Sequence, residues 1–181
     1  MRIQFGKLKR RNLVVGKNNK MRPTQSITKD KIFNVINIEE GDTFVDLFAG
    51  TGAVGFEAVS LGAGECIWSD ISRESVVAIK ENIETFELNQ DKYKVFKSDF
   101  RMVLRKLPFK ADYIFIDPPF IAAKYYEEAI ELIEKYESLS PEGMIILEKP
   151  IKIELNIGKQ FKIKVRKKIG DKEILFITNY D

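Results

Sequence analysis

Apolar residues recur along most of the chain in two distinct patterns of spacing. Short apolar runs, typical of buried strands, occupy residues 43–48, 65–69, 93–97, 111–116 and 144–148. Between them, apolar residues recur at helical spacing, which predicts helices at residues 53–61, 72–86, 101–106 and 125–136. Because strands and helices alternate and the strands are largely apolar, the pattern predicts an α/β protein with a doubly wound, parallel, Rossmann-like sheet.

The N-terminal region departs from this alternation. Residues 2–5 and 12–15 lie on either side of a basic, glycine-containing turn, which predicts a small β-hairpin. A helix beginning at Ser26 or Thr28 and continuing to Asn37 is expected to follow.

The C-terminal region predicts a second hairpin. Residues 160–168 and 173–178 surround a Gly-Asp turn, so this hairpin would add antiparallel strands at one edge of the sheet. We therefore expect two units, a basic hairpin arm at residues 1–25 and the main domain at residues 26–181.

Composition excludes several classes of protein. A chain of 181 residues, 44% hydrophobic and 31% charged, is typical of one globular domain. It contains no histidine and one cysteine, Cys66, so we expect no metal, no His-based triad and no disulfide framework. No apolar run reaches the roughly 18 residues of a membrane helix, and the start lacks a secretory signal. These features predict a cytoplasmic protein, which we expect to be a monomer.

Charge is distributed unevenly along the chain. Residues 1–31 contain ten Lys or Arg and one acid, whereas residues 32–151 contain 12 basic and 22 acidic residues. A basic arm on an acidic body favours binding of a polyanion through one face, although simple solvation explains the same charge. The candidates for nucleic-acid phosphate contacts are Lys7, Lys9, Arg10, Arg11 and Arg22.

The segment DLFAGTGAVG, residues 46–55, carries G-x-G-x-x-G between a strand and a helix. Asp70 follows Gly50 by twenty residues, at the end of the next strand, a spacing typical of sites that bind adenosine-containing cofactors. Both NAD and S-adenosylmethionine (SAM) contain adenosine. Asp46 favours SAM, because a carboxylate beside the loop repels a pyrophosphate but attracts a cationic amino group and a sulfonium. The helix N-terminus is then available for the methionine carboxylate.

Further residues are candidates for the same cofactor site. Asp99 and Phe100 follow the strand at 93–97 and could contact the amino group and the face of adenine. Capping of a helix by Ser98 or Asp99 explains these residues equally well. We expect the remaining cofactor contacts to come from Phe48, Ala49, Gly52 and Ile71.

The strand at 111–116 ends in Asp117-Pro118-Pro119-Phe120. The amino group of a nucleobase is a poor nucleophile, because its lone pair is delocalised into the ring. Two acceptors beside its N–H bonds, the Asp117 carboxylate and the Pro118 carbonyl, would direct that lone pair at an electrophilic methyl group. The prolines restrict φ and remove competing donors, Phe120 could stack on a flipped base, and Asp117 also borders the cofactor site. The alternative is a turn that ends the strand.

These motifs carry a family resemblance. DLFAGTGAVGFEA (46–58) with DPPF (117–120) resembles class I SAM-dependent methyltransferases that modify nucleobase amino groups. MRIQFGKLKRRNL and MRPTQSITKDKIFNVI are similar to the start of the RsmD family. The resemblance implies a seven-stranded sheet with an N-terminal hairpin, SAM as cofactor, and methylation of guanine N2 in 16S rRNA on an assembled or assembling small subunit. Lys29-Asp30-Lys31 departs from the Arg-Glu-Ala that the family often has there.

The resemblance also implies roles for individual residues. It implies cofactor contacts for Asp46, Gly50, Gly52, Asp70 and Asp99, and a catalytic role for residues 117–120. Three alternatives stay open. D-P-P-F is compatible with adenine-N6 methylation of DNA or RNA, the glycine loop with an NAD-dependent oxidoreductase, and the basic arm with a non-catalytic nucleic-acid-binding module.

Overall fold

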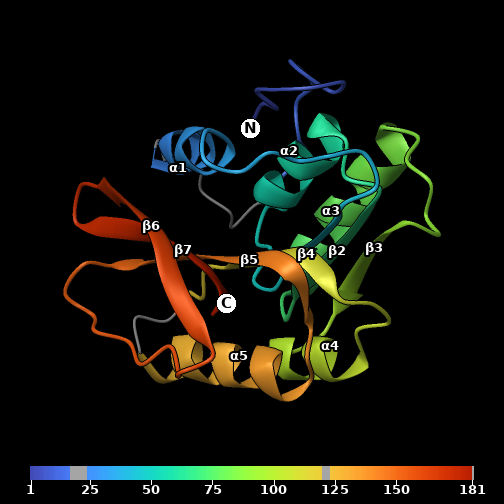
Figure 1. Ribbon diagram of the computed structural model, residues 1–181. Coiled ribbons are helices and arrows are strands. Elements are labelled where there is room, and N and C mark those ends of the chain that lie inside the picture. The colour runs from blue at the N-terminus through green and yellow to red at the C-terminus, as the bar shows by residue number, and fades with distance from the viewer. Residues whose placement is uncertain (17–23, 120–122, 181) are drawn as a thin grey trace.

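The computed structural model describes residues 1–16, 24–119 and 123–180. Its centre is a seven-stranded sheet of order β3-β2-β1-β4-β5-β7-β6 (Figure 1). Strands β1 to β5 are parallel, and β7 runs antiparallel between β5 and β6. The predicted doubly wound α/β sheet is therefore confirmed. The strands are β1 (Thr43–Asp46), β2 (Glu65–Asp70), β3 (Tyr93–Lys97), β4 (Ala111–Ile116), β5 (Leu139–Pro150), β6 (Phe161–Ile169) and β7 (Lys172–Asn179).

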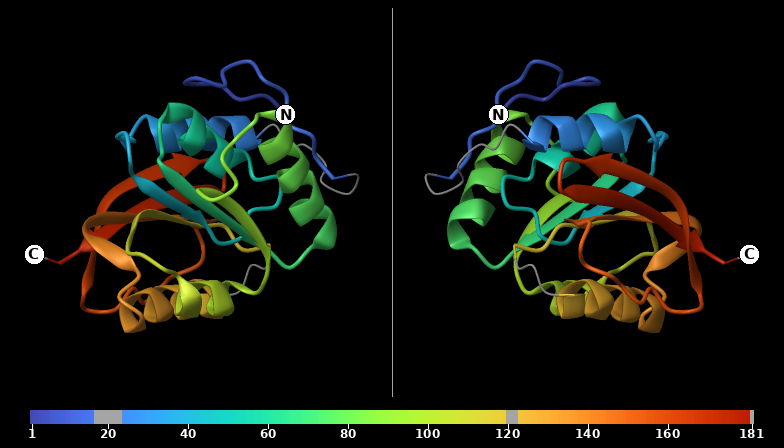
Figure 2. Two further views of the ribbon diagram at one scale, coloured as in Figure 1. Left: turned by 90° about the vertical axis from the view of Figure 1, so that its right-hand side faces the viewer. Right: turned by 90° about the vertical axis from the view of Figure 1, so that its left-hand side faces the viewer.

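Helices cover both faces of the sheet (Figures 1 and 2). One face carries α1 (Thr24–Phe33), α2 (Ala53–Leu61) and α3 (Arg73–Thr85), and the other carries α4 (Phe100–Lys106) and α5 (Ala123–Lys135). Helix α3 begins where the Ser72 hydroxyl accepts a hydrogen bond from the Ser75 amide, which satisfies one of the free N–H groups of the first turn. Among the described residues, no helix has the length and apolar character needed to cross a membrane.

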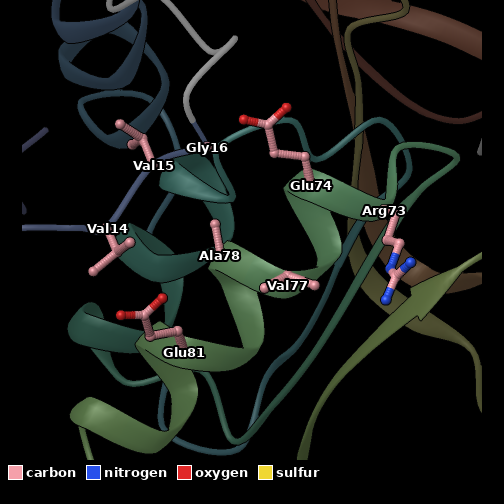
Figure 3. Close-up of a pocket in the computed structure, with 8 residues that line it drawn as sticks. All are labelled: Val14, Val15, Gly16, Arg73, Glu74, Val77, Ala78 and Glu81. Carbon is pink, nitrogen blue, oxygen red and sulfur yellow. The ribbon is translucent and has the colours of Figure 1, made fainter.

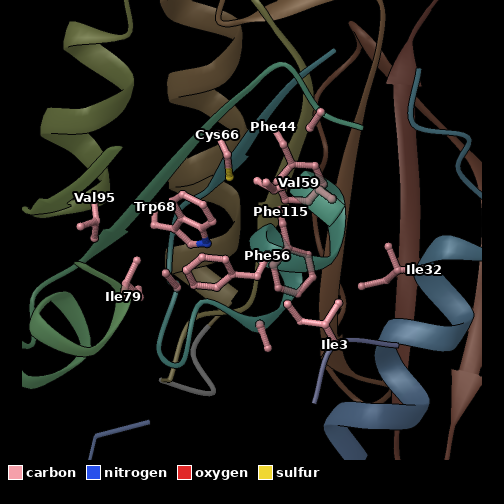
Figure 4. Close-up of a cluster of buried hydrophobic side chains, with 14 of the residues drawn as sticks. Ile3, Ile32, Phe44, Phe56, Val59, Cys66, Trp68, Ile79, Val95 and Phe115 are labelled. Atoms are coloured by element: carbon pink, nitrogen blue, oxygen red, sulfur yellow. The ribbon is translucent and has the colours of Figure 1, made fainter. Parts of the chain in front are cut away.

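The central strands β1, β2 and β4 are largely apolar because they are buried on both faces, whereas the edge strands β3 and β6 are more exposed and carry lysines. Phe44 and Trp68 point toward the α1–α3 face (Figure 4), whereas their neighbours Val45 and Ile67 point toward α4 and α5. Each such side chain, removed from water, stabilises the fold by about 1.5–3 kcal/mol. The two clusters hold the strands rigidly, so residues at the strand ends occupy defined positions.

The N-terminal segment folds back on itself as a hairpin, with backbone hydrogen bonds from the Ile3 amide to Arg11, the Arg10 amide to Ile3 and the Leu13 amide to Met1, at 2.7–3.0 Å. Residues 1–16, the arm, contain a single antiparallel bridge, between Arg2 and Asn12, and no strand. Other backbone amides of the arm bond to buried helix side chains: Glu57 and Ser60 on α2 and Asn82 on α3 accept from them at 2.6–2.8 Å. The arm is therefore packed on the main domain.

Several predicted boundaries were wrong. Helix α1 begins at Thr24, before the predicted start at Ser26 or Thr28, and ends at Phe33, before the predicted end at Asn37; the chain leaves it through a turn. Strand β5 begins at Leu139 rather than at the predicted residue 144, because residues 140–143 form a bulge within it: pairing passes from Ala111–Leu139 directly to Tyr113–Met144. The C-terminal hairpin is confirmed as β6 and β7.

Candidate active site

Four acidic residues lie where neighbouring parallel strands end. Asp46 and Asp70 are the last residues of β1 and β2, and Asp99 and Asp117 follow β3 and β4 closely. The chain leaves β1 toward β2 on one side, while β4 pairs with β1 on the other. Such a switch in strand order opens a crevice at the carboxyl ends of the strands, where α/β proteins bind ligands. The four acids therefore lie at one edge of the sheet, where its parallel strands end.

Asp46 is the most deeply buried acid of this group. It is 1% exposed, and its Oδ1 atom has no hydrogen-bond partner among the described residues. Burial, followed by the negative charges of Asp117 and Asp70, raises the pKa of Asp46 to about 8, and the Gly55 and Phe48 amides only partly oppose this. A buried acceptor without a partner is rare in folded proteins. A cationic group bound beside Asp46 would therefore stabilise this buried carboxylate.

The glycines of the loop have different roles. Gly50 has a φ of 53° and open space where a Cβ would stand, so the loop is accessible at this point. A Cβ on Gly55 would lie 2.2 Å from the Trp68 indole nitrogen, and one on Gly52 would press on Ile79. Gly50 is thus the position open to a ligand, whereas Gly52 and Gly55 allow close helix packing.

Asp70 organises the loop directly. Its two carboxylate oxygens accept hydrogen bonds from the amides of Gly50 and Ser72, at 2.7 and 2.8 Å. Ile71, beside it, is 63% exposed, an unusual position for a large apolar side chain. Ala49 is buried and bonds to β2 through its amide, so it shapes the loop. Asp70 and Ile71 are available to a ligand at the end of β2.

Asp99 and Phe100 fit the capping alternative. Asp99 caps α4 by accepting from the Arg101 amide at 2.9 Å, and it also pairs with the Arg101 guanidinium. Phe100 is 3% exposed, its ring packs against Phe48 at 5.0 Å, and Arg101 lies over it. Stacking of Phe100 on adenine would therefore require Arg101 to move. The Asp99 side chain, 43% exposed, keeps its predicted contact with the adenine amino group possible.

Asp117 lies beside Asp46 across two neighbouring strands. Asp46 pairs with Phe115, so Asp117 is two residues, or about 7 Å, further along the strand direction. Pro118 is buried and Pro119 exposed, while Phe120 lies outside the described residues. The motif and the glycine loop therefore face the same crevice.

Tyr126 was not predicted as part of this site. It is 2% exposed on α5, and burial together with the charges of Asp117 and Glu148 raises the pKa of its hydroxyl. No sequence motif marks it, because its position depends on the packing of α5 under β4 and β5.

The basic tip of the arm does not reach this edge. Lys7, Lys9, Arg10 and Arg11 are exposed, and the Lys7 amide donates to the Ser60 carbonyl in the last turn of α2. Since α2 starts at the glycine loop and extends about 13 Å, the tip lies at its far end. RNA binding by these four cations stays a prediction, and Arg22 lies outside the described residues.

Two hollows on the described surface are separate from the four acids. One, of about 680 Å³, lies between arm residues 14–16 and the outer side of α3 (Figure 3). The other, of about 840 Å³, lies near Lys110, Leu139 and Tyr180, at the end of the sheet where β4 and β5 begin. In the described ranges, no group of three His, Cys, Asp or Glu residues could hold a metal ion.

Comparisons with known proteins identify the family. A family model described as Conserved hypothetical protein 95 matches residues 1–178. The Bacillus subtilis protein YlbH, provisionally named an rRNA methyltransferase, is 34% identical over 161 residues, covering 86% of this chain and 85% of its own length. Ribosomal RNA small subunit methyltransferase D of Haemophilus influenzae is 29% identical over 153 residues, covering 82% and 78%.

A solved structure agrees with this match. The structure of yhhF from Escherichia coli, provisionally assigned as a methyltransferase, has a TM-score of 0.87 at 24% identity and covers 99% of this chain and 97% of its own. At 24% identity, this similarity shows that the two chains share a fold. Together with the family match, it means that this chain belongs to the RsmD family of methyltransferases.

Proposed function

We propose that this protein transfers a methyl group from SAM to the N2 amino group of a guanine in small-subunit (16S) rRNA, on an assembled or assembling subunit. The observation that carries the proposal is the proximity of Asp46, the last residue of β1, and Asp117, the residue after β4, at the ends of two paired strands. A cation bound at Asp46 and an amino group bound at Asp117 would meet in one crevice. The relatives named rRNA methyltransferases support rRNA as the substrate class.

The residues at the strand ends fit SAM. When bound, SAM supplies an electrophilic methyl group on a sulfonium. The unpartnered Asp46 oxygen would accept from its amino group, and the N-terminus of α2 would hold its carboxylate. Asp70 would accept from the ribose hydroxyls, Ile71 would cover the adenine, and Asp99 would bind the adenine amino group. An NAD pyrophosphate, in contrast, would lie beside the charge of Asp46.

Asp117 and Pro118 would orient the attacking amine. The Asp117 carboxylate and the Pro118 carbonyl accept its two N–H bonds, which directs the nitrogen lone pair toward the methyl group. Holding the reacting atoms in line removes much of the entropic barrier. Because the amine becomes acidic once methylated, a weak base such as Asp117 suffices to take its proton. Phe120 would stack on the flipped base.

Nucleoside analysis tests this proposal. The purified protein is incubated with radiolabelled SAM and small ribosomal subunits from cells that lack it, and the rRNA is digested to nucleosides. We expect label in N2-methylguanosine. Label in N6-methyladenosine would establish the alternative adenine-N6 activity, and absence of label in any nucleoside, on subunits or on free DNA and RNA, would overturn the proposal.

Cofactor affinity should depend on pH through Asp46. S-adenosylhomocysteine keeps the cationic amino group, which binds best to ionised Asp46. Since the pKa of free Asp46 is about 8, lower pH protonates it, and affinity should fall about tenfold per pH unit below that value. Calorimetric titration between about pH 6 and pH 8 measures this, and Asp46→Asn should flatten the profile. An unchanged affinity across this range would show that Asp46 does not bind the amino group.

A further inference from the structure

The edge strand β6 carries an exposed run of basic residues. Its sequence is FKIKVRKKI, and Lys164, Arg166, Lys167 and Lys168 are all exposed. Because β6 ends the strand order, one of its sides pairs with β7 and the other pairs with no strand of the described sheet. Lys164, Lys167 and Lys168 form no ion pair among the described residues. Lys167 and Lys168 are consecutive in the strand, so their side chains extend from opposite faces of the sheet at its β6 edge. We call Lys164, Lys167 and Lys168, which line this edge, the β6 cationic surface.

Strand register brings this surface level with the catalytic motif. Ile116 at the end of β4 pairs with Leu147 of β5, which pairs with Leu175 of β7, which pairs with Arg166 of β6. Since β6 runs parallel to β4, the residues after Arg166 are level with those after Ile116. Lys167 and Lys168 are thus level with Asp117 and Pro118, three strand spacings, or about 14 Å, away.

The acidic residues nearby do not neutralise this surface. Glu173 pairs with Lys149 at 2.6 Å and with Arg166 at 3.3 Å, and Glu148 pairs with Lys172 at 2.6 Å. Asp171 is exposed in the turn between β6 and β7. The charges of Lys164, Lys167 and Lys168 therefore remain available to a partner.

We propose that the β6 cationic surface binds the phosphate backbone of the RNA strand that carries the target nucleotide, an inference that rests on the proposed function. A separation of 14 Å corresponds to about four nucleotides of a stacked strand, at roughly 3.4 Å each. Phosphates a few nucleotides from a base bound at Asp117 would therefore lie along the β6 edge, within reach of Lys167 on one face and Lys168 on the other. The arm tip, at the far end of α2, would contact a more distant part of the same substrate.

Lysines on an edge strand also prevent pairing with other sheets. Substitution by glutamine separates the two roles, because glutamine keeps a polar edge and removes the charge. The variant is Lys164→Gln/Lys167→Gln/Lys168→Gln. The matched control is Lys80→Gln/Lys92→Gln/Lys94→Gln, which removes three exposed lysines on α3, before β3 and on β3, the opposite edge strand.

Binding to RNA is measured as a function of salt by fluorescence anisotropy, with 16S rRNA extracted from cells that lack the protein as the probe. The logarithm of the association constant falls with the logarithm of salt by about 0.7 to 0.9 for each phosphate neutralised. We expect the β6 variant to lower this slope by about 2 to 3 and to raise KM for ribosomal subunits at least tenfold. The control variant should match the wild type, and S-adenosylhomocysteine affinity and Tm should be unchanged in both.

Equal salt slopes and equal KM values for the two variants would overturn the inference. Self-association of the β6 variant with unchanged RNA affinity would also overturn it, because that result indicates that the lysines only protect the sheet edge. Failure of the proposed function is a different result. In that case the wild type transfers no methyl group to subunits, whatever the salt slopes of the variants.

Discussion

Replacing Asp117 by alanine is expected to reduce kcat for methyl transfer by about 10²–10³-fold, while S-adenosylhomocysteine still binds. The substitution removes one of the two acceptors that orient the attacking amine, an interaction made most strongly in the transition state. It also removes a negative charge that raises the pKa of Asp46. The pKa of Asp46 should therefore fall, and the midpoint of the pH dependence of cofactor binding should move to lower pH. Steady-state kinetics and calorimetry on the same variant measure both effects.

A suitable control is Asp91→Ala, which removes an exposed carboxylate in the turn before β3. It should change neither kcat nor the pH midpoint. If Asp117→Ala retained wild-type kcat, the D-P-P motif would be a strand-ending turn and the proposed mechanism would be wrong. If the variant lost cofactor binding as completely as catalysis, Asp117 would belong to the cofactor site.

Glu57→Ala is expected to produce the largest loss of stability, about 3–5 kcal/mol of unfolding free energy. Glu57 is 0% exposed and pairs with buried Lys29 at 2.8 Å. Its other oxygen accepts from the amides of Gln4 and Phe5 at 2.8 and 2.6 Å. Alanine would leave the Lys29 charge buried and two arm amides without an acceptor. Urea unfolding measures the loss, and hydrogen exchange at residues 4–8 should show that the arm opens first.

The contrast with an exposed ion pair makes this prediction specific. Lys110 pairs with Glu137 at 3.2 Å, but the two side chains are 53% and 76% exposed, so Lys110→Ala should cost at most about 1 kcal/mol. Replacing both Lys29 and Glu57 by methionine removes the buried charges together and should restore part of the stability. If Glu57→Ala and Lys110→Ala were equally stable, the buried pair would not hold the arm in place.

The burial of three polar helix side chains could not be predicted from the sequence. Glu57, Ser60 and Asn82 are polar residues in helical segments, which usually indicates a solvent-exposed face. Each is buried, because its partners are arm amides more than 50 residues away in the chain. Local periodicity contains no information about such distant contacts, so the arm was predicted as a separate hairpin.

The sequence by itself determined the alternation of strands and helices, the glycine loop and the acids that end the strands. These features are local: a strand covered on both faces must be apolar, and a loop that approaches a ligand requires glycine at a defined spacing. Only the tertiary structure decided which charges share an edge. The basic tip of the arm and the lysines of β6 look alike as sequence, but the order and register of the strands bring only the latter level with Asp117.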